Sequence, residues 1–381
     1  MRILITTGIF APESGGPATY APALASRLAQ GGHEVTVLTY SSQASYDFDA
    51  KYQFKLVRIV RGGRVLNRIR FFFVALHYVR ACELIYTLDW FAAGLPVALL
   101  AVIFRRPYVV RLGGDYLWEQ LYLESGAEPM PLRDFYARGF DRRPAYAPAR
   151  MVIRWVLSHA RMSVFNSDAQ RELYEKYYGL LPSRTATIYN PTPEVQKSGL
   201  VRGTPTTELV YCGRLIVMKN VSSLIRAFAR ARLPASYTLT IIGDGPQKPS
   251  LEKLVKDLHL EEKVQIHKGM GNRDMLMRIK DARAFILPTW TDISPNQVCE
   301  ALAIGLPVVV SRENYLSFRD QLPETIDPQD IDDIASKLEM VADDARYEDF
   351  AARFRAISFE HTWDDVLREH VAIFKDVLGS T

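Results

Sequence analysis

The sequence predicts an α/β protein with two doubly wound domains. Short apolar segments alternate with helical segments twice along the 381 residues, before and after a stretch without periodicity at 191–207. Such alternation predicts parallel sheets covered by helices. The stretch at 191–207 is rich in Pro, Gly and Thr, which is typical of a linker between domains. At roughly 100–200 residues per domain, the chain length also fits two domains.

The composition is that of an ordinary globular protein, with 48% hydrophobic and 24% charged residues. Cys82, Cys212 and Cys299 are scattered and odd in number, so they form neither a disulfide framework nor a metal-binding pattern. No basic segment with a cleavage site opens the chain, and the apolar windows are interrupted before the roughly 20 residues that a membrane span needs. We therefore expect a cytoplasmic protein.

Charge is distributed unevenly between the two halves. Residues 1–190 carry 23 Lys/Arg against 15 Asp/Glu, a balance of +8, whereas 191–381 carry 24 against 28, a balance of −4. Basic residues gather at 61–80 and 133–161, together with the aromatic residues Phe71, Phe72, Phe73, Tyr136, Phe140, Tyr146 and Trp155. We predict that these segments dock the first domain on the anionic inner face of the cell membrane. The alternative is a solvated basic surface above phenylalanines that fill the core.

The first half opens with a βαβ unit. A strand is expected at 2–7, a glycine turn at Gly15 and Gly16 opens a helix over about 18–29, and a second strand follows at 34–39. The turn lacks the G-x-G-x-x-G pattern of dinucleotide-binding proteins, which argues against a nicotinamide oxidoreductase. Its amides are nevertheless suited to a phosphate at the helix N-terminus. Further strands are expected at 54–60, 84–89, 108–115, 163–167 and 185–189.

The second half repeats the alternation. Strands are expected within ELVYCGRL, YTLTIIGDGP, KVQIHKG, RAFILP and VVV, with helices between them and a helical tail from Ile331 to Leu378. Arg214 and Lys219 stand five residues apart across the first strand-to-helix turn. We expect both to reach one diphosphate, the arginine as a fork and the lysine as a point charge. Gly243 and Gly245, in the turn at the end of the second of these strands, allow a close backbone approach to a ligand.

Residues 289–310, TWTDISPNQVCEALAIGLPVVV, combine a polar loop, a helix expected over 298–304 and a buried strand. This arrangement binds anions and sugars in open α/β sheets. Asp292 lies in the loop and Glu300 about one turn into the helix. We expect both carboxylates to face a ligand, with Glu300 accepting hydrogen bonds from a ribose diol. In the alternative interpretation, Asp292 caps the loop and Glu300 is a solvated helix residue.

These motifs resemble those of the retaining glycosyltransferases of family four, which have the GT-B fold of two facing Rossmann-like domains with a cleft between them. CGRLIVMKN is similar to the GRL…K segment of that family, and IIGDGPQKPSLEKL to its G-D-G-P turn and following helix. TDISPNQVCEALAIGLPVVV resembles its E-x7-E element followed by A-x-x-x-G-x-P-V-V. The first half matches more loosely, through SGGPATYAPALASRLAQGGHEVTVLT, NSDAQREL and IYNP. The likeness covers nearly the whole chain.

The resemblance implies a division into four parts. Residues 1–190 would form an N-terminal acceptor-side domain, 191–207 a linker and 208–360 a C-terminal domain that binds a nucleotide sugar. Residues 361–381 would form a C-terminal helix that packs back on the N-terminal domain.

The resemblance also implies roles for individual residues. Those implied in catalysis are Arg214, Lys219, Asp292 and Asp115, and those implied in donor binding are Gly15, Gly16, Gly213, Gly243, Asn296 and Glu300. Asp292 stands where the family usually has Glu. Gly113, Gly114 and Asp115 stand where the family often has a histidine, and Asp115 is expected to act on the acceptor side.

The implied activity is transfer of a sugar, as by a hexosyltransferase, from a nucleotide-diphosphate donor to a lipid-linked or saccharide acceptor. The anomeric configuration would be retained, and the product would belong to cell-envelope polysaccharide or glycolipid synthesis. Side chains and helix ends would bind the diphosphate, so we expect neither a metal nor another cofactor, and no nucleic acid partner. The alternative is a non-catalytic nucleotide-sugar-binding protein of the same fold. The Asp at 292 and the absent histidine favour that alternative, whereas Arg214, Lys219 and Glu300 oppose it.

Overall fold

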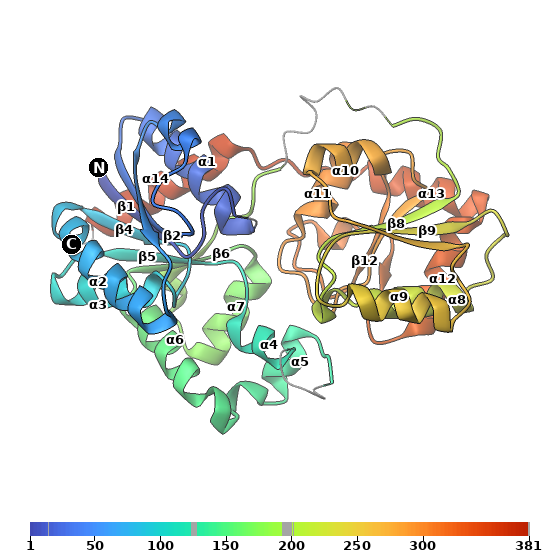
Figure 1. Cartoon of the computed structure of the whole chain (residues 1–381), viewed down its shortest axis with the longest axis horizontal. Helices are drawn as coiled ribbons and strands as arrows, with labels where there is room; N and C mark the ends of the chain where they lie inside the picture. Colours follow the sequence, from blue (N-terminus) through green and yellow to red (C-terminus); the bar gives the residue numbers. More distant parts are fainter. Residues whose placement is uncertain (14, 123–127, 193–199, 201, 380–381) are drawn as a thin grey trace. The chain divides into compact units, whose positions relative to one another are not determined.

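The computed structural model describes residues 1–13, 15–122, 128–192, 200 and 202–379 (Figure 1). The predicted linker at 191–207 lies partly outside these ranges. The chain divides into two compact units, each assembled from separate segments. Unit 1 comprises Met1–Leu117, Gly139–Tyr189 and Thr362–Thr381, and unit 2 comprises Trp118–Arg138 and Asn190–His361. The segment 118–138, which the sequence analysis assigned to the N-terminal domain, thus groups with unit 2.

Unit 1 is built on a parallel sheet of seven strands in the order β3-β2-β1-β4-β5-β6-β7. The strands are β1 (Arg2–Thr7), β2 (Glu34–Ser41), β3 (Lys55–Val60), β4 (Leu84–Thr87), β5 (Tyr108–Leu112), β6 (Met162–Phe165) and β7 (Thr185–Thr187). The central strands β1, β4 and β5 are almost wholly buried, and most of their residues are apolar, as expected for a sheet covered on both faces.

Helices cover both faces of this sheet. They are α1 (Gly16–Gln30), α2 (Arg64–Ala81), α3 (Gly94–Ile103), α6 (Ala147–His159), α7 (Asp168–Tyr178) and α14 (Trp363–Gly379), with α4 (Tyr116–Leu121) at the boundary of the unit. Figure 1 shows α1 and α14 on one face and α2, α3 and α6 on the other. This arrangement follows from right-handed crossovers, because the chain leaves β1 toward one edge of the sheet and leaves β3, β4 and β5 toward the other.

The C-terminal helix α14 is part of the core of unit 1. Val366, Phe374 and Val377 pack in the same apolar cluster as β1 and α1. On the same helix, His370 is fully buried, and its Nε2 accepts a hydrogen bond from the Tyr86 hydroxyl at 2.7 Å. Its Nδ1 lies 2.7 Å from the Val366 carbonyl and therefore carries the proton. The sequence analysis expected this helix to lie against the N-terminal domain, and the structure places it there.

Unit 2 holds a parallel sheet of six strands in the order β10-β9-β8-β11-β12-β13. The strands are β8 (Glu208–Cys212), β9 (Thr238–Ile242), β10 (Val264–His267), β11 (Ala284–Leu287), β12 (Val308–Ser311) and β13 (Thr325–Ile326). Counted from β8, this is the 3-2-1-4-5-6 order of the Rossmann fold. The predicted α/β class with two Rossmann-like domains is confirmed.

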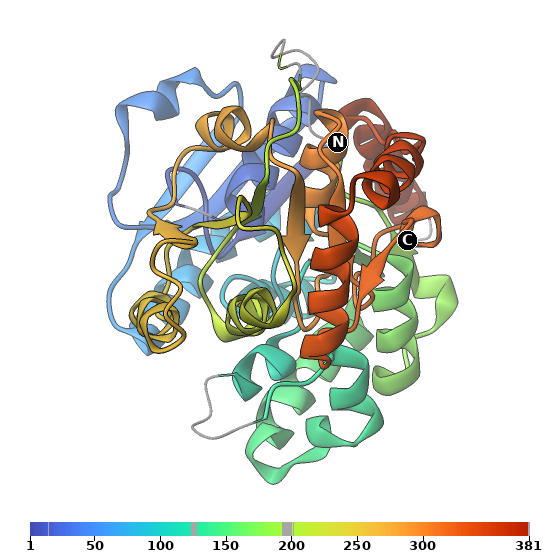
Figure 2. The same ribbon diagram turned by 90° about the vertical axis from the view of Figure 1, so that its right-hand side faces the viewer.

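The helices of unit 2 are α5 (Leu132–Ala137), α8 (Val221–Arg230), α9 (Lys248–Asp257), α10 (Asn272–Ile279), α11 (Asn296–Ala303), α12 (Ile331–Ala342) and α13 (Asp344–Arg355). Figures 1 and 2 show helices on both faces of the sheet, with α8, α9 and α12 on one and α10 and α11 on the other. No helix in the described ranges of either unit is both long and apolar enough to cross a membrane.

Candidate active site

The loops that carry most of the predicted site residues meet at one edge of the sheet in unit 2. They follow β8, β9 and β11 and span residues 213–220, 243–247 and 288–296. The strand order reverses between β8 and β11, since the chain leaves β8 toward β9 and leaves β11 toward β12. Ligands of open α/β sheets bind at the carboxyl ends of the strands at such a reversal.

The loops after β8 and β9 are joined backbone to backbone. Gly213 N–H donates to the Ile242 carbonyl and Leu215 N–H to the Asp244 carbonyl, each at 2.9 Å. A Cβ atom at Gly243 would lie 1.9 Å from the carbonyl oxygen of Gly213, which no side chain tolerates. The sequence analysis expected this glycine to admit a ligand. In the structure, the absence of a side chain at Gly243 instead allows the backbone of the loop after β8 to pack against it. This contact helps to fix the position of the loop that carries Arg214.

The loops after β8 and β11 are held together by Asn220. This residue has φ 55° and is buried, and its side-chain amide donates to the carbonyls of Pro288 (3.1 Å) and Pro328 (2.9 Å). Trp290 N–H adds a bond of 3.1 Å to the Met218 carbonyl. Asparagine tolerates this left-handed backbone conformation better than most residues. Asn220 therefore allows the chain to turn within the β8 loop, and its side chain binds the carbonyls of two other segments.

Lys219 and Asp292 form an ion pair across these loops. Lys219 Nζ lies 2.5 Å from Asp292 Oδ2, and the two side chains are only 13% and 12% exposed. An ammonium group has three N–H donors, so the contact with Asp292 leaves two for a ligand. Asp292 is itself held by backbone bonds, because its N–H donates to the Glu313 carbonyl and its carbonyl accepts from Tyr315 N–H, each at 3.0 Å.

Arg214 differs from Lys219 in being exposed. Within the described residues no carboxylate lies at ion-pair distance from its guanidinium group. Its carbonyl accepts a hydrogen bond of 3.1 Å from the hydroxyl of Tyr211, a residue buried beneath the loop. The backbone of Arg214 is therefore fixed, while its guanidinium group remains available to an anion.

Glu300 lies in the second turn of α11, and its Oε1 accepts a hydrogen bond of 2.7 Å from the side chain of Asn272 at the start of α10. Burial raises the pKa of Glu300, and the bond from Asn272 partly offsets this rise. At the N-terminus of α11, the Asn296 side chain accepts a hydrogen bond of 3.1 Å from Asn190. Sequence analysis missed Asn272, because an asparagine at the start of a helix more often acts as a cap.

A segment far away in the sequence supports the β11 loop. Leu132 N–H, at the start of α5, donates to Thr291 Oγ1 at 2.8 Å. The next residue, Arg133, places its Nη2 at 2.6 Å from Oε1 of the buried Glu313, whose carbonyl binds Asp292. α5 thus holds the loop that carries Asp292. Nothing in the sequence indicated this contact.

Removing the Arg133 side chain should destabilise unit 2. Burial raises the pKa of Glu313, and Arg133 is the main influence that lowers it. Arg133→Ala should cost about 1 kcal/mol in the free energy of unfolding, the low end of the range for a buried polar group that loses its partner, because Arg133 itself is well solvated. The loss should be largest at neutral pH. It should shrink in acid, where Glu313 takes up a proton and no longer needs a cation.

Urea unfolding of Arg133→Ala at several pH values measures this effect. Arg138→Ala, which removes an exposed arginine of the same segment, is the matched control and should leave stability unchanged. Equal effects of the two substitutions, or a loss for Arg133→Ala that grows in acid, would contradict the assigned pairing.

The predicted site residues of unit 1 lie in two places. Gly15 and Gly16 open α1, where the Gly15 carbonyl accepts from Ala18 N–H at 3.0 Å and a Cβ at Gly15 would lie 2.7 Å from Ile9 Cδ1. Asp115, after β5, is 1% exposed and accepts a hydrogen bond of 2.9 Å from the Tyr174 hydroxyl. Its side chain is therefore almost inaccessible to solvent.

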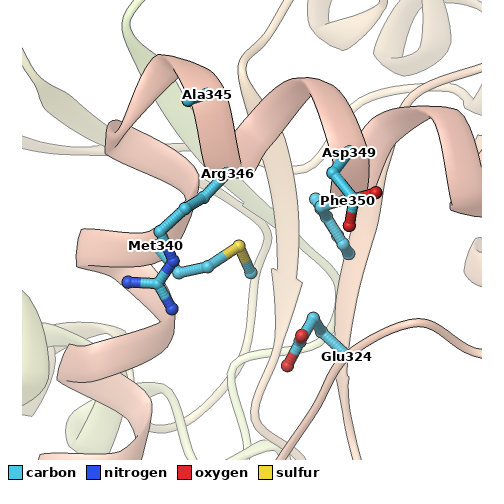
Figure 3. Close-up of a pocket in the computed structure, with 6 residues that line it drawn as sticks. All are labelled: Glu324, Met340, Ala345, Arg346, Asp349 and Phe350. Atoms are coloured by element: carbon cyan, nitrogen blue, oxygen red, sulfur yellow. The ribbon is translucent and has the colours of Figure 1, made fainter.

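A pocket of about 330 Å³ lies elsewhere in unit 2 (Figure 3). It is lined by Glu324, Met340, Ala345, Arg346, Asp349 and Phe350. Glu324 directly precedes β13 and pairs with Lys337 at 2.6 Å. The pocket is therefore at the amino end of this strand, whereas the candidate site is at the carboxyl ends, and we assign it no role.

Comparison with known families gives two matches that together span most of the chain. The sequence model described as "Glycosyltransferase Family 4" matches residues 14–194, and that described as "Glycosyl transferases group 1" matches residues 206–344. The boundary between the two matches falls in the predicted linker.

Named relatives are similar along most of their length. A GDP-mannose-dependent alpha-(1-6)-phosphatidylinositol monomannoside mannosyltransferase of Mycolicibacterium smegmatis is 25% identical over 336 residues, 81% of this chain and 80% of that protein. The alpha-monoglucosyldiacylglycerol synthase of Streptococcus pneumoniae is 24% identical over 337 residues, 83% of this chain and 72% of that protein.

Solved structures share the fold over the whole chain. The Anabaena protein HepE in complex with UDP superposes with a TM-score of 0.73 at 17% identity, covering 99% of this chain and 100% of that one. Sucrose-phosphate synthase of Thermosynechococcus elongatus gives a TM-score of 0.73 at 17% identity and covers 100% of both chains.

Proposed function

Because the chain belongs to the group 1 glycosyltransferases of family four, we propose that it transfers a sugar from a nucleoside-diphosphate donor with retention of the anomeric configuration. Two cations in one strand-to-helix loop of unit 2 carry the proposal, together with the carboxylate of Asp292 that orients one of them. Nucleotide binding by relatives supports it, since the HepE structure contains UDP and the mycobacterial enzyme is named for GDP-mannose.

In this proposal Arg214 and Lys219 bind the diphosphate. As the bond between sugar and diphosphate breaks, negative charge grows on the departing nucleotide, and fixed cations stabilise it without reorganisation. Asp292 holds Lys219 in place, so its first role is positioning. The amides at the N-terminus of α11, near Asn296, offer further donors to a phosphate or a sugar hydroxyl. Gly15 and Gly16 would offer amides in the same way from α1.

The acceptor that fits the relatives is a lipid. The mycobacterial relative is named for phosphatidylinositol monomannoside as the molecule that it mannosylates, and the pneumococcal one for its product, alpha-monoglucosyldiacylglycerol. We therefore propose a lipid-linked acceptor and a place in cell-envelope glycolipid or polysaccharide synthesis.

A donor screen tests the proposal. The protein is incubated with UDP-, GDP- and ADP-linked hexoses, with and without total membrane lipid as acceptor, and nucleotide release is measured. Release from one donor class, stimulated by lipid and unchanged by EDTA, is the expected result, and the anomer of the product is then read by NMR. Tight donor binding with no release under any condition would favour the non-catalytic alternative.

Donor binding should depend on the ionisation of Glu300. An ionised carboxylate accepts two hydrogen bonds from a ribose diol, so donor affinity should fall as the pH is lowered through the pKa of Glu300. Because burial raises this pKa, the fall should begin at a higher pH than for a solvated glutamate. Glu300→Gln should weaken binding and abolish this pH dependence, which isothermal titration at several pH values measures.

Asn272→Ala is the informative companion variant. It removes the hydrogen bond that lowers the pKa of Glu300, so the fall in affinity should move to higher pH. An unchanged pH dependence in both variants would remove Glu300 from donor binding. The same conclusion would follow if a 2′-deoxy donor bound as tightly as its parent.

A further inference from the structure

We propose that the outer faces of α2, α3 and α6 in unit 1 form a docking surface for an anionic lipid membrane. These three helices lie side by side on one face of the sheet, α3 packing against both of the others (Figure 1). We call them the α2–α3–α6 layer. Binding of this surface to lipid does not depend on the proposed glycosyl transfer.

The outer face of α2 carries an apolar stripe. Leu66, Ile69 and Phe73 follow one another at intervals of three and four residues, which puts them on one side of the helix. All three are exposed, Phe73 by 64%. The opposite side of the helix is directed to the core, where Phe71 and Ala75 are completely buried.

The other two helices of the layer also expose apolar side chains. Leu99, Val102 and Ile103 are exposed on α3, Ile103 by 63%, and Met151 on α6 is 69% exposed. Seven of the eleven large hydrophobic side chains that are exposed in the described chain therefore belong to these three helices. Apolar side chains gathered in this way on a monomer mark an interaction surface.

The charges of the α2–α3–α6 layer indicate that it binds an anionic surface. The sequences of α2, α3 and α6 contain no Asp or Glu, whereas α7 and α14 of the same unit each contain several. Exposed arginines lie on these helices or within two residues of their C-terminal ends, at Arg70, Arg80, Arg105, Arg154 and Arg161. None of these five lies at ion-pair distance from a carboxylate of the described residues. Such a surface is complementary to lipid phosphates above an acyl layer.

The same charge argues against a second copy of the chain as the occupant. A symmetric dimer through this face would bring two carboxylate-free, arginine-bearing surfaces together, and like charges at an interface repel. Headgroup phosphates neutralise the arginines, and the apolar side chains reach the acyl boundary below them.

The structure changes which residues are expected to touch lipid. Sequence analysis assigned insertion to aromatic residues of 61–80 and 133–161, but Phe71, Tyr136 and Tyr146 are buried. Arg133, counted with the second segment, belongs to unit 2 and pairs with Glu313. On the exposed stripe of α2, Phe73 is the aromatic residue expected to insert into lipid. The exposed aliphatic residues of α3 join the docking surface, although the sequence analysis assigned no lipid contact to this helix.

Vesicle co-sedimentation with the full chain tests the surface. We expect binding to vesicles with about one-third phosphatidylglycerol, little binding to pure phosphatidylcholine, and release of bound protein at high salt. The double substitution Phe73→Ser with Arg70→Ala should weaken binding at least tenfold, since one arginine near an anionic surface accounts for about fivefold and loss of apolar insertion adds to it. Its thermal unfolding should be unchanged, because both side chains are exposed.

The matched control is Met277→Ser with Arg273→Ala, an exposed apolar and basic pair at similar spacing on α10 of unit 2. It should bind vesicles as the parent does. Equal losses in both variants, salt-independent binding to both vesicle types, or no binding would overturn the proposal. So would a dimer, seen by sedimentation velocity, that the Phe73→Ser, Arg70→Ala variant alone abolishes.

A site-specific probe locates the contact. All three native cysteines are buried, so Phe73→Cys allows selective labelling with an environment-sensitive dye. We expect its fluorescence to rise with anionic vesicles, while the same dye at Met277→Cys stays unchanged. A rise at Met277→Cys without one at Phe73→Cys would place the membrane contact elsewhere and refute the assignment.

Discussion

Replacing Lys219 or Arg214 with alanine is expected to lower kcat/KM by about 10²-fold or more. Each would supply electrostatic stabilisation to the departing diphosphate, and loss of one preorganised donor costs about that factor in enzymes that use such groups. The two variants should differ in stability. Arg214 is exposed and has no carboxylate at ion-pair distance within the described residues, so Arg214→Ala should unfold like the parent. Lys219→Ala leaves Asp292 without its partner and should be slightly less stable.

Steady-state kinetics with a saturating acceptor, together with thermal unfolding, measure these effects. Arg226→Ala is the control, since it removes an exposed arginine from α8 of the same unit. Asp292→Asn keeps the size of the side chain but weakens its hold on Lys219, so its rate should lie between those of the parent and Lys219→Ala. If Arg214→Ala and Lys219→Ala both retained full activity, the diphosphate clamp would have to be abandoned.

Gly243→Ala is expected to destabilise unit 2 strongly. Its Cβ would lie 1.9 Å from the Gly213 carbonyl oxygen and 3.1 Å from its carbon, and neither backbone atom can swing aside as a side chain would. The loops after β8 and β9 must separate, which strains the bonds of Gly213 and Leu215 to β9 and its loop. We expect a loss of about 3 kcal/mol in the free energy of unfolding. Activity should fall as well, because the same shift moves Arg214.

Gly271→Ala serves as the control for this effect. The Cβ there would meet only Asp274 Oδ2, at an ordinary 3.6 Å, so the cost should be about 1 kcal/mol or less, from the weaker N-cap of α10. Urea unfolding followed by circular dichroism compares the two. Equal stabilities for both variants would mean that the loops after β8 and β9 can separate at little cost in free energy. The close contact between these loops would then not be the reason for a glycine at position 243.

Several features of the fold were predictable because they depend on local pattern. Apolar segments of four to six residues between amphipathic segments predicted every strand of both sheets except β13, since a strand covered on both faces needs apolar residues throughout. β13 has only two residues, too few to form such a segment. The boundaries were less accurate. The strand expected at 108–115 ends at Leu112, because Gly113 and Gly114 leave the sheet, and the helix expected from Val298 starts at Asn296. The sequence analysis expected no helix at α4 or α5, because each is only six residues long, too short to show a helical period.

The sequence by itself determined the two Rossmann-like sheets, the strand ends after which Arg214, Lys219 and Asp292 stand, and the following helix that carries Glu300. Periodicity and glycine placement are local, and parallel strands bring their carboxyl ends to one edge. The tertiary structure alone decided the partners. It pairs Asp292 with Lys219 and Glu300 with Asn272, sets Gly243 against Gly213 and buries Asp115. It also pairs Arg133 of α5 with Glu313. On α2, it exposes Phe73 and buries Phe71 in the core. Such pairings join residues up to about 180 positions apart, and no local pattern encodes which of many polar side chains will meet once the sheets have formed.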